Sequence, residues 1–191
     1  MNRGRIDTPW AVAGMSLVLT LVIWAVVASP LPAHFADGIP FSARIDPLDQ
    51  VIAMKSGDHL QLLYHFWLAA DMVGGGETRW FKNLYEFNTG DDAERLEPGT
   101  YYAPFSLVYA FARPFLGDAG GWNAAGLASI WLTCFFAWLL ARRYTDSTWM
   151  AAAAAGAAIL FPYPWFSLFG GSPTGFAVPL LPMTLLLSLI H

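Results

Sequence analysis

The sequence predicts an all-helical (all-α) integral membrane protein, with several transmembrane helices and a large first loop on the outer side of the membrane. Three observations predict this class. Hydrophobic residues make up 56% of the chain and charged residues only 13%, whereas soluble domains carry about 25% charged residues. Uncharged runs of about 20 residues, the length that crosses a bilayer, recur along the chain. One long polar section separates the first run from the others.

The first predicted span covers about residues 10–29 and contains no charged residue. Arg3 and Arg5 precede it, and Pro30 follows it. A cleaved signal peptide is the alternative, with a cleavage site near residues 26–33. The apolar run is longer than the roughly 7–15 residues of a signal-peptide core, which favours a membrane anchor.

Residues 33–121 contain the long polar section and are predicted to face the outer side. Acidic residues outnumber basic ones there, and glycine and proline interrupt it. Within it, residues 104–115 are apolar apart from Arg113. Because this part is too short to span a bilayer, we expect an interfacial or re-entrant segment. The chain as a whole has a net charge of -4 and no basic stripe, so we expect no nucleic-acid partner.

An amphipathic helix is predicted within this loop, from Asp58 to Val73. Helical spacing places three polar side chains on one face: Asp58, Gln61 and His65. The neighbouring face is apolar and consists of Leu62, Phe66, Ala69 and Val73. Such a helix should lie along the outer membrane surface instead of crossing the bilayer. The helix dipole favours the ionised form of Asp58, which suits a base as well as a helix cap.

The second predicted span covers residues 122–141, and Arg142 and Arg143 follow it at once. Positive charge prefers the cytoplasmic side of a membrane. Two crossings separate these arginines from the two near the N-terminus, so both pairs fall on the same side. The sequence therefore predicts a cytoplasmic N-terminus and an exported loop. Cys134, the only cysteine, lies in this span, which excludes an internal disulfide and a thiolate zinc site; we expect it to be buried.

Two more spans are predicted at about residues 148–167 and 174–190, where no formal charge occurs. The third is expected to kink near Pro162, and two prolines are expected to bend the fourth. The whole chain, residues 1–191, is therefore predicted to form a single membrane domain. Because it stops directly after an apolar run, we expect it to be the front part of a larger protein.

The order of features along the chain is distinctive. After the first helix, an acid opens the amphipathic helix, and the segment WFKNLYEFN follows at residues 80–88. Residues 101–144 then supply a proline-led apolar half-helix, a Gly117-Asp118 turn, a spanning helix and an Arg-Arg exit. This layout resembles that of membrane glycosyltransferases of the C-type (GT-C) superfamily. The resemblance implies many transmembrane helices, catalysis at the outer membrane face, and transfer of a sugar from a polyprenyl-phosphate donor to a lipid, glycan or protein acceptor.

The resemblance also implies that one acid of the first loop acts as the catalytic base. Asp58, in the segment SGDHLQ, matches that position best. Asp46 and Asp49 lie nearer the first helix and are the next candidates. Asp91 and Asp92 form an adjacent pair and come last. A base of this kind must reach the acceptor hydroxyl within hydrogen-bond distance.

Substrate-binding residues are expected around this base. Gln61 and His65 share its helix face, while Arg79, Lys82 and Arg113 carry the positive charge that holds a phosphate leaving group. No metal ligands are assigned, because no HExxH or comparable spacing occurs. Since some members of the superfamily use a divalent metal ion and others use none, the cofactor stays open. The expected partners are membrane lipid and a polyprenyl-phosphate-linked sugar, and the expected location is a bacterial inner (cytoplasmic) membrane.

Two other classes stay open at this point. A transporter fragment would suit the proline-broken helices, although no acid or base lies within any predicted span, where coupled carriers often place one. A non-catalytic or truncated membrane protein, such as an assembly factor, would suit a chain with only four spans. The long acidic loop favours the transferase over the transporter, and the non-catalytic protein stays open.

Overall fold

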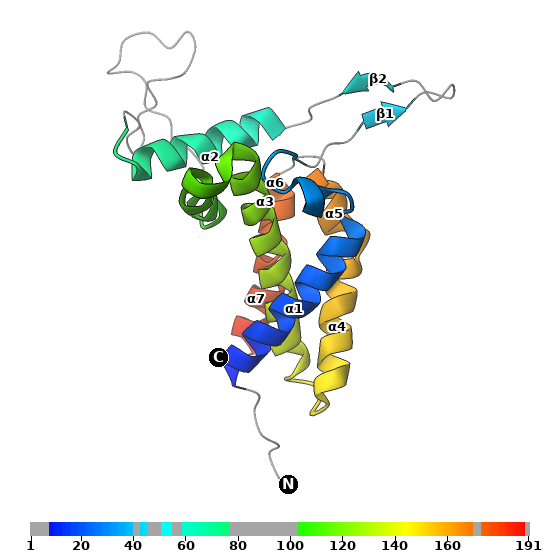
Figure 1. Cartoon of the computed structure of the whole chain (residues 1–191). Coiled ribbons are helices and arrows are strands. Elements are labelled where there is room, and N and C mark those ends of the chain that lie inside the picture. Colours follow the sequence, from blue (N-terminus) through cyan, green and yellow to red (C-terminus); the bar gives the residue numbers. More distant parts are fainter. Residues whose placement is uncertain are drawn as a thin grey trace.

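The chain folds into a helical bundle with one helix laid across its end (Figure 1). The computed structural model describes residues 8–39, 43–45, 51–54, 59–76, 103–169 and 173–189. Its elements are, in chain order, α1 (Pro9–Val27), the 3-10 helix η1 (Leu31–His34), β1 (Ala43–Ile45), β2 (Val51–Met54), α2 (His59–Val73), α3 (Phe105–Ala141), α4 (Thr148–Leu160), α5 (Pro162–Phe169), α6 (Pro173–Ala177) and α7 (Leu180–Ser188). The long helix α3 lies at the centre and contacts α1, α2, α4, α6 and α7. The helical class is confirmed, and the sequence analysis missed one small antiparallel hairpin of β1 and β2.

Among the described residues, two helices are long and apolar enough to cross a membrane: α1, with 19 residues, and α3, with 37. α1 covers residues 10–27 of the first predicted span, and α3 contains the whole of the second. The third and fourth predicted spans are each divided into two shorter helices, α4 with α5 and α6 with α7. The first division falls at Pro162, as expected, because proline cannot donate a helical hydrogen bond. Across this break the indole nitrogen of Trp165 donates to the carbonyl oxygen of Ile159 at 2.6 Å, which satisfies a carbonyl at the end of α4.

The polarity of α1 is the reverse of that of a helix in a water-soluble protein. Ser16 and Thr20 face α3 and α4 and are 0% exposed. Val18 and Val22 point away from the bundle and are 62% and 59% exposed. Small polar residues at helix contacts and branched apolar residues outside are typical of helices surrounded by lipid. In water, such an apolar outer face would be a large exposed patch.

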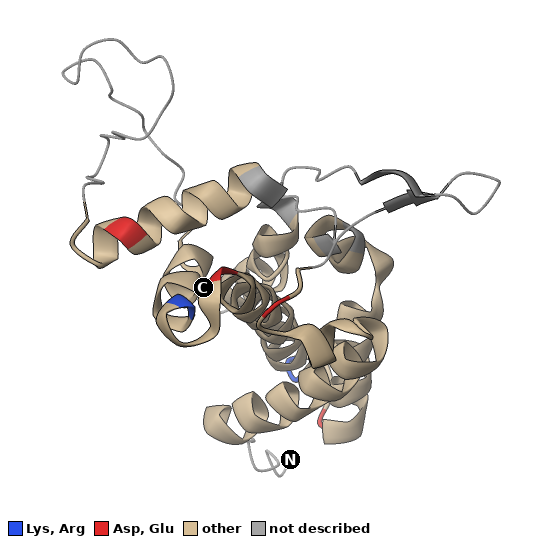
Figure 2. Ribbon diagram, turned by 45° about the horizontal axis from the view of Figure 1, so that its top comes forward, with Lys and Arg blue, Asp and Glu red and all other residues tan. Residues whose placement is uncertain are grey.

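Charged side chains in the described part of the chain lie at the two ends of the bundle (Figure 2). Asp71 lies in α2, Arg113 and Asp118 lie in the first part of α3, and Asp37 directly precedes Gly38, whose carbonyl oxygen bonds Asn123 of α3; Arg142, Arg143 and Asp146 follow the C-terminal end of α3. Between the two groups, residues 119–141 of α3 carry no charge. At 1.5 Å per residue this stretch is about 35 Å long, close to the roughly 30 Å of a bilayer core.

Hydrogen bonds from side chains connect α3 to the first helix and to the segment that follows it. The indole nitrogen of Trp131 donates to the carbonyl oxygen of Ala13, at 3.2 Å, on α1. The amide nitrogen of the buried Asn123 donates to the carbonyl oxygens of Phe35, at 2.8 Å, and Gly38, at 2.6 Å. These bonds hold the segment after α1 against the same end of α3 that supports α2.

Aromatic packing attaches α2 to the end of the bundle. Phe66 is fully buried and contacts the rings of Tyr109, Trp122 and Phe176, with ring centroids 5.2–5.6 Å apart. These three residues belong to α3 and α6, so one side chain of α2 attaches it to both of these helices. The predicted apolar face of α2 is confirmed for Leu62, Phe66 and Ala69, all of which are buried. Its last member, Val73, is instead largely exposed at the end of the helix.

Candidate functional site

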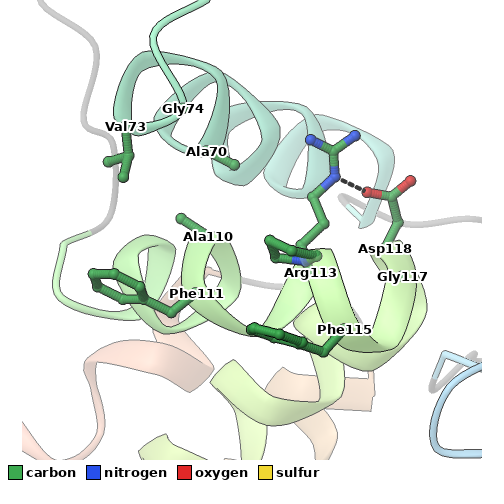
Figure 3. Close-up of a pocket in the computed structure, with 10 residues that line it drawn as sticks. Ala70, Val73, Gly74, Ala110, Phe111, Arg113, Phe115, Gly117 and Asp118 are labelled. Atoms are coloured by element: carbon green, nitrogen blue, oxygen red, sulfur yellow. Dashed lines mark hydrogen bonds and ion pairs between the residues drawn. The ribbon is translucent and has the colours of Figure 1, made fainter.

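A cleft of about 630 Å³ lies between the C-terminal half of α2 and the first part of α3 (Figure 3). Its walls are mostly apolar, and one acid and one base lie among the residues that line it: Ala70, Val73, Gly74, Ala110, Phe111, Arg113, Pro114, Phe115, Gly117 and Asp118. An apolar concave surface with few convergent polar groups is the usual form of a small-molecule site. This cleft therefore is the candidate functional site.

The cleft exists because α3 is broken at Gly117. The backbone there has φ 70° and ψ -176°, a conformation that is essentially restricted to glycine. Residues 105–116 form a separate helical segment, which turns aside from the rest of α3 and lies beside α2 (Figures 1 and 3). We call residues 105–116 the half-helix. It agrees with the interfacial segment that was predicted for residues 104–115, although its position relative to a membrane is a proposal.

The break brings together three side chains that a continuous helix would separate. The hydroxyl of Tyr109 donates to Oδ1 of Asp118 at 2.5 Å, and Nε of Arg113 donates to the same oxygen at 2.6 Å. With 100° per residue, an unbroken helix would place Arg113 about 140° and Tyr109 about 180° away from Asp118. Gly117 is therefore the residue on which this cluster depends.

The cluster favours charged Asp118 and neutral Tyr109. The hydrogen bond from Tyr109, together with Arg113, holds the pKa of Asp118 below its ordinary value. Burial and the hydrogen bond to Asp118 raise the pKa of Tyr109. Because the folded-state pKa of Asp118 is lowered, any stabilisation from its ionised form is present at neutral pH and is lost as the pH falls through that pKa. Arg113 thus has an ionised partner over the whole neutral range.

The predicted site residues are only partly brought together. Arg113 lines the cleft, whereas Gln61 and His65 lie in the first half of α2 and do not line it. Gln61 is exposed and His65 is half-buried. The other predicted residues lie outside the described part of the chain: Asp46, Asp49, Asp58, Arg79, Lys82, Asp91 and Asp92.

Sequence reasoning missed Tyr109 and Asp118 as members of the site. The Gly117-Asp118 pair was a usable signal, since glycine followed by an acid inside an apolar helix often marks a break. Their pairing with Arg113 was not predictable from helical spacing, for the reason given above. No group of three His, Cys, Asp or Glu side chains among the described residues is arranged to hold a metal ion.

A second, mostly apolar groove of about 750 Å³ lies between α3, α4, α5 and α7. Phe161, Tyr163 and Pro164 from the α4–α5 break line part of it, opposite Leu181 and Leu185 of α7. Its lining contains no charged residue, so it suits a hydrocarbon chain.

Comparison with protein-family models, with curated proteins and with solved structures finds no match for this chain. Its function is therefore inferred from its own residues.

Replacing Gly117 by alanine should destabilise the protein by about 1–3 kcal/mol, because alanine would be strained in this conformation or would force α3 to straighten. Straightening would also separate Arg113 from Asp118. The measurement is the free energy of unfolding in mixed detergent micelles. Gly126→Ala is the matched control, since an added Cβ there meets its nearest neighbour only at 4.0 Å and alanine favours a helix interior. Equal stabilities of the two variants would contradict the proposed importance of the break.

Proposed function

We propose that this chain is part of a membrane glycosyltransferase that takes its sugar from a polyprenyl-phosphate donor at the outer face of a bacterial inner membrane. The observation that carries the proposal is Arg113, an arginine in an apolar cleft at one end of a lipid-type helix bundle. Such a cleft suits an amphiphile with an anionic head. The order of elements along the chain, which resembles that of GT-C enzymes, adds the transfer reaction.

In the proposed topology, α1 and residues 119–141 of α3 cross the bilayer. The end of the bundle that carries α2 faces outward, and the N-terminus and the two arginines after α3 are cytoplasmic. The supporting observations are the apolar outer face of α1 and the separation of charges to the two ends of the bundle. Lying across the outward end, α2 and the half-helix then occupy the interface, where amphipathic segments are stable.

In the proposed reaction, Asp58 takes the proton of the acceptor hydroxyl, whose oxygen attacks the anomeric carbon of the sugar. The bond between that carbon and the phosphate oxygen breaks, and the polyprenyl phosphate leaves with the bonding electrons. Arg113 stabilises the negative charge on the departing phosphate. The apolar groove or the apolar side of the half-helix would hold the hydrocarbon chain of the carrier.

Native mass spectrometry tests the proposal directly. The chain, purified from membranes in a mild detergent, should retain a polyprenyl phosphate when mixed with total lipid extract, and Arg113→Gln should lose most of it. The matched control is Arg143→Gln, which removes an exposed arginine at the opposite end of the bundle. Absence of a prenyl-phosphate adduct, or equal loss in both variants, would contradict the proposed site. Binding without any transfer by the full-length protein would instead favour a non-catalytic lipid-binding role.

A further inference from the structure

We infer that Asp118, fixed by Tyr109, orients the Arg113 guanidinium so that its two terminal nitrogens bind two oxygens of an anionic group in the cleft. The inference rests on the proposed function and deepens it. It makes Asp118 and Tyr109 positioning residues for the phosphate site. It also defines the ligand chemistry as an anion with two acceptor oxygens, attached to an apolar chain.

The first step is the manner in which Arg113 is paired. Asp118 accepts from Nε, through one carboxylate oxygen. A guanidinium has five N–H donors, of which four belong to the two terminal nitrogens. Within the described part of the chain, those four meet no acceptor. Figure 3 shows the Arg113 side chain extending from the half-helix toward α2, with Nε bonded to Asp118 and the two terminal nitrogens farther out at the end of the side chain. An anion with two oxygens matches this free edge.

The second step is the rigidity of the support. The Tyr109 side chain is fully buried between Phe66 and the long part of α3. Gly121 provides the necessary space, since a Cβ at that position would lie 2.8 Å from Cδ2 of Tyr109. The Tyr109 hydroxyl holds the same carboxylate oxygen that accepts from Arg113. A long arginine side chain is thereby held in one orientation before any ligand arrives, which lowers the entropic cost of binding.

The third step concerns the charge of the site. Asp118 is ionised and lies next to Arg113, so their formal charges cancel. Attraction of an anion therefore depends on the direction of the free N–H groups more than on net charge. Phe111 and Phe115 extend the apolar wall beside Arg113. Inorganic phosphate alone should consequently bind weakly, and a phosphate monoester with a hydrocarbon chain should bind well.

The test uses the whole chain in detergent micelles, with farnesyl phosphate, farnesol and inorganic phosphate as probes and tryptophan fluorescence as readout. Asp118→Asn is expected to weaken farnesyl phosphate binding about tenfold, because the charge-assisted hydrogen bond that fixes Arg113 becomes a weaker one to a neutral amide oxygen. Farnesol binding should change less than about twofold, because the apolar wall is intact. Tyr109→Phe should act in the same direction with a smaller effect, and it carries the test if Asp118→Asn does not fold.

A change in farnesyl phosphate binding opposite to the expected one would overturn the inference. If Asp118 merely competes with the ligand for Arg113, Asp118→Asn will strengthen farnesyl phosphate binding. If Asp118 only holds the fold, farnesol binding will fall as much as farnesyl phosphate binding. Either result, together with a loss of binding in Arg113→Gln, would remove the positioning role and leave the proposed phosphate site intact. Failure of the unmodified chain to bind farnesyl phosphate would overturn both.

Discussion

Lysines at both position 18 and position 22 are expected to prevent α1 from inserting into a bilayer. Val18 and Val22 lie near the middle of the helix and face away from the bundle. A lysine at the centre of a spanning helix costs about 2.5–3.5 kcal/mol, so the pair costs about 5–7 kcal/mol. In a water-soluble protein the same substitutions at exposed positions would change stability by less than about 0.5 kcal/mol each.

The measurement is the inserted fraction of α1 in a microsomal glycosylation assay, together with the resistance of the full chain to carbonate extraction. Trp10→Lys is the matched control. Trp10 is 86% exposed but lies in the first turn of α1, where a lysine can extend its ammonium group to the interface. Insertion should survive in the control. A double-lysine chain that folds and stays in solution without lipid would overturn the membrane topology.

Asp58→Asn in the full-length protein is expected to abolish sugar transfer while leaving membrane insertion unchanged. General-base catalysis contributes roughly 10²–10⁴ in rate, and an amide cannot accept the proton of the acceptor hydroxyl. The measurement is the transfer of radiolabelled sugar from a polyprenyl-phosphate donor by purified protein. Asp146→Asn is the control, because Asp146 is an exposed acid at the opposite end of the bundle.

Retained transfer by Asp58→Asn would remove Asp58 from the mechanism. The acids at 46 and 49 would then be the next candidates. If Asp46→Asn or Asp49→Asn abolishes transfer instead, the base lies closer to the first helix than proposed. Normal binding of the lipid donor by the inactive variant would separate loss of chemistry from loss of the site.

Several elements were predictable because their signals are local. The uncharged run at residues 10–29 corresponds to α1, and the apolar period from Leu62 to Ala69 defines the buried face of α2. Pro162 marked the break between α4 and α5, because its effect on the backbone does not depend on its surroundings. Burial of Cys134 was also expected and is confirmed.

Other features depend on contacts that are distant in the sequence. The hairpin of β1 and β2 gave no clear period in its short strands of three and four residues. Val73, in the last turn of α2, is exposed because it lines the open cleft and does not pack into the core. Nothing in the spacing of Tyr109, Arg113 and Asp118 indicates one cluster, since an ideal helix would separate them.

By itself, the sequence determined which segments are helical and apolar and where the uncharged segments begin and end. It also determined that α2 has one polar and one apolar face. These properties follow from residue type and backbone periodicity within a few turns. The tertiary structure alone decided that Phe66 joins α2 to the bundle, and that the turn at Gly117, which the sequence analysis expected, brings Arg113 to Asp118 beside a cleft. The physical reason is that one backbone angle at a glycine changes the direction of the whole half-helix, and only packing between distant residues selects that angle.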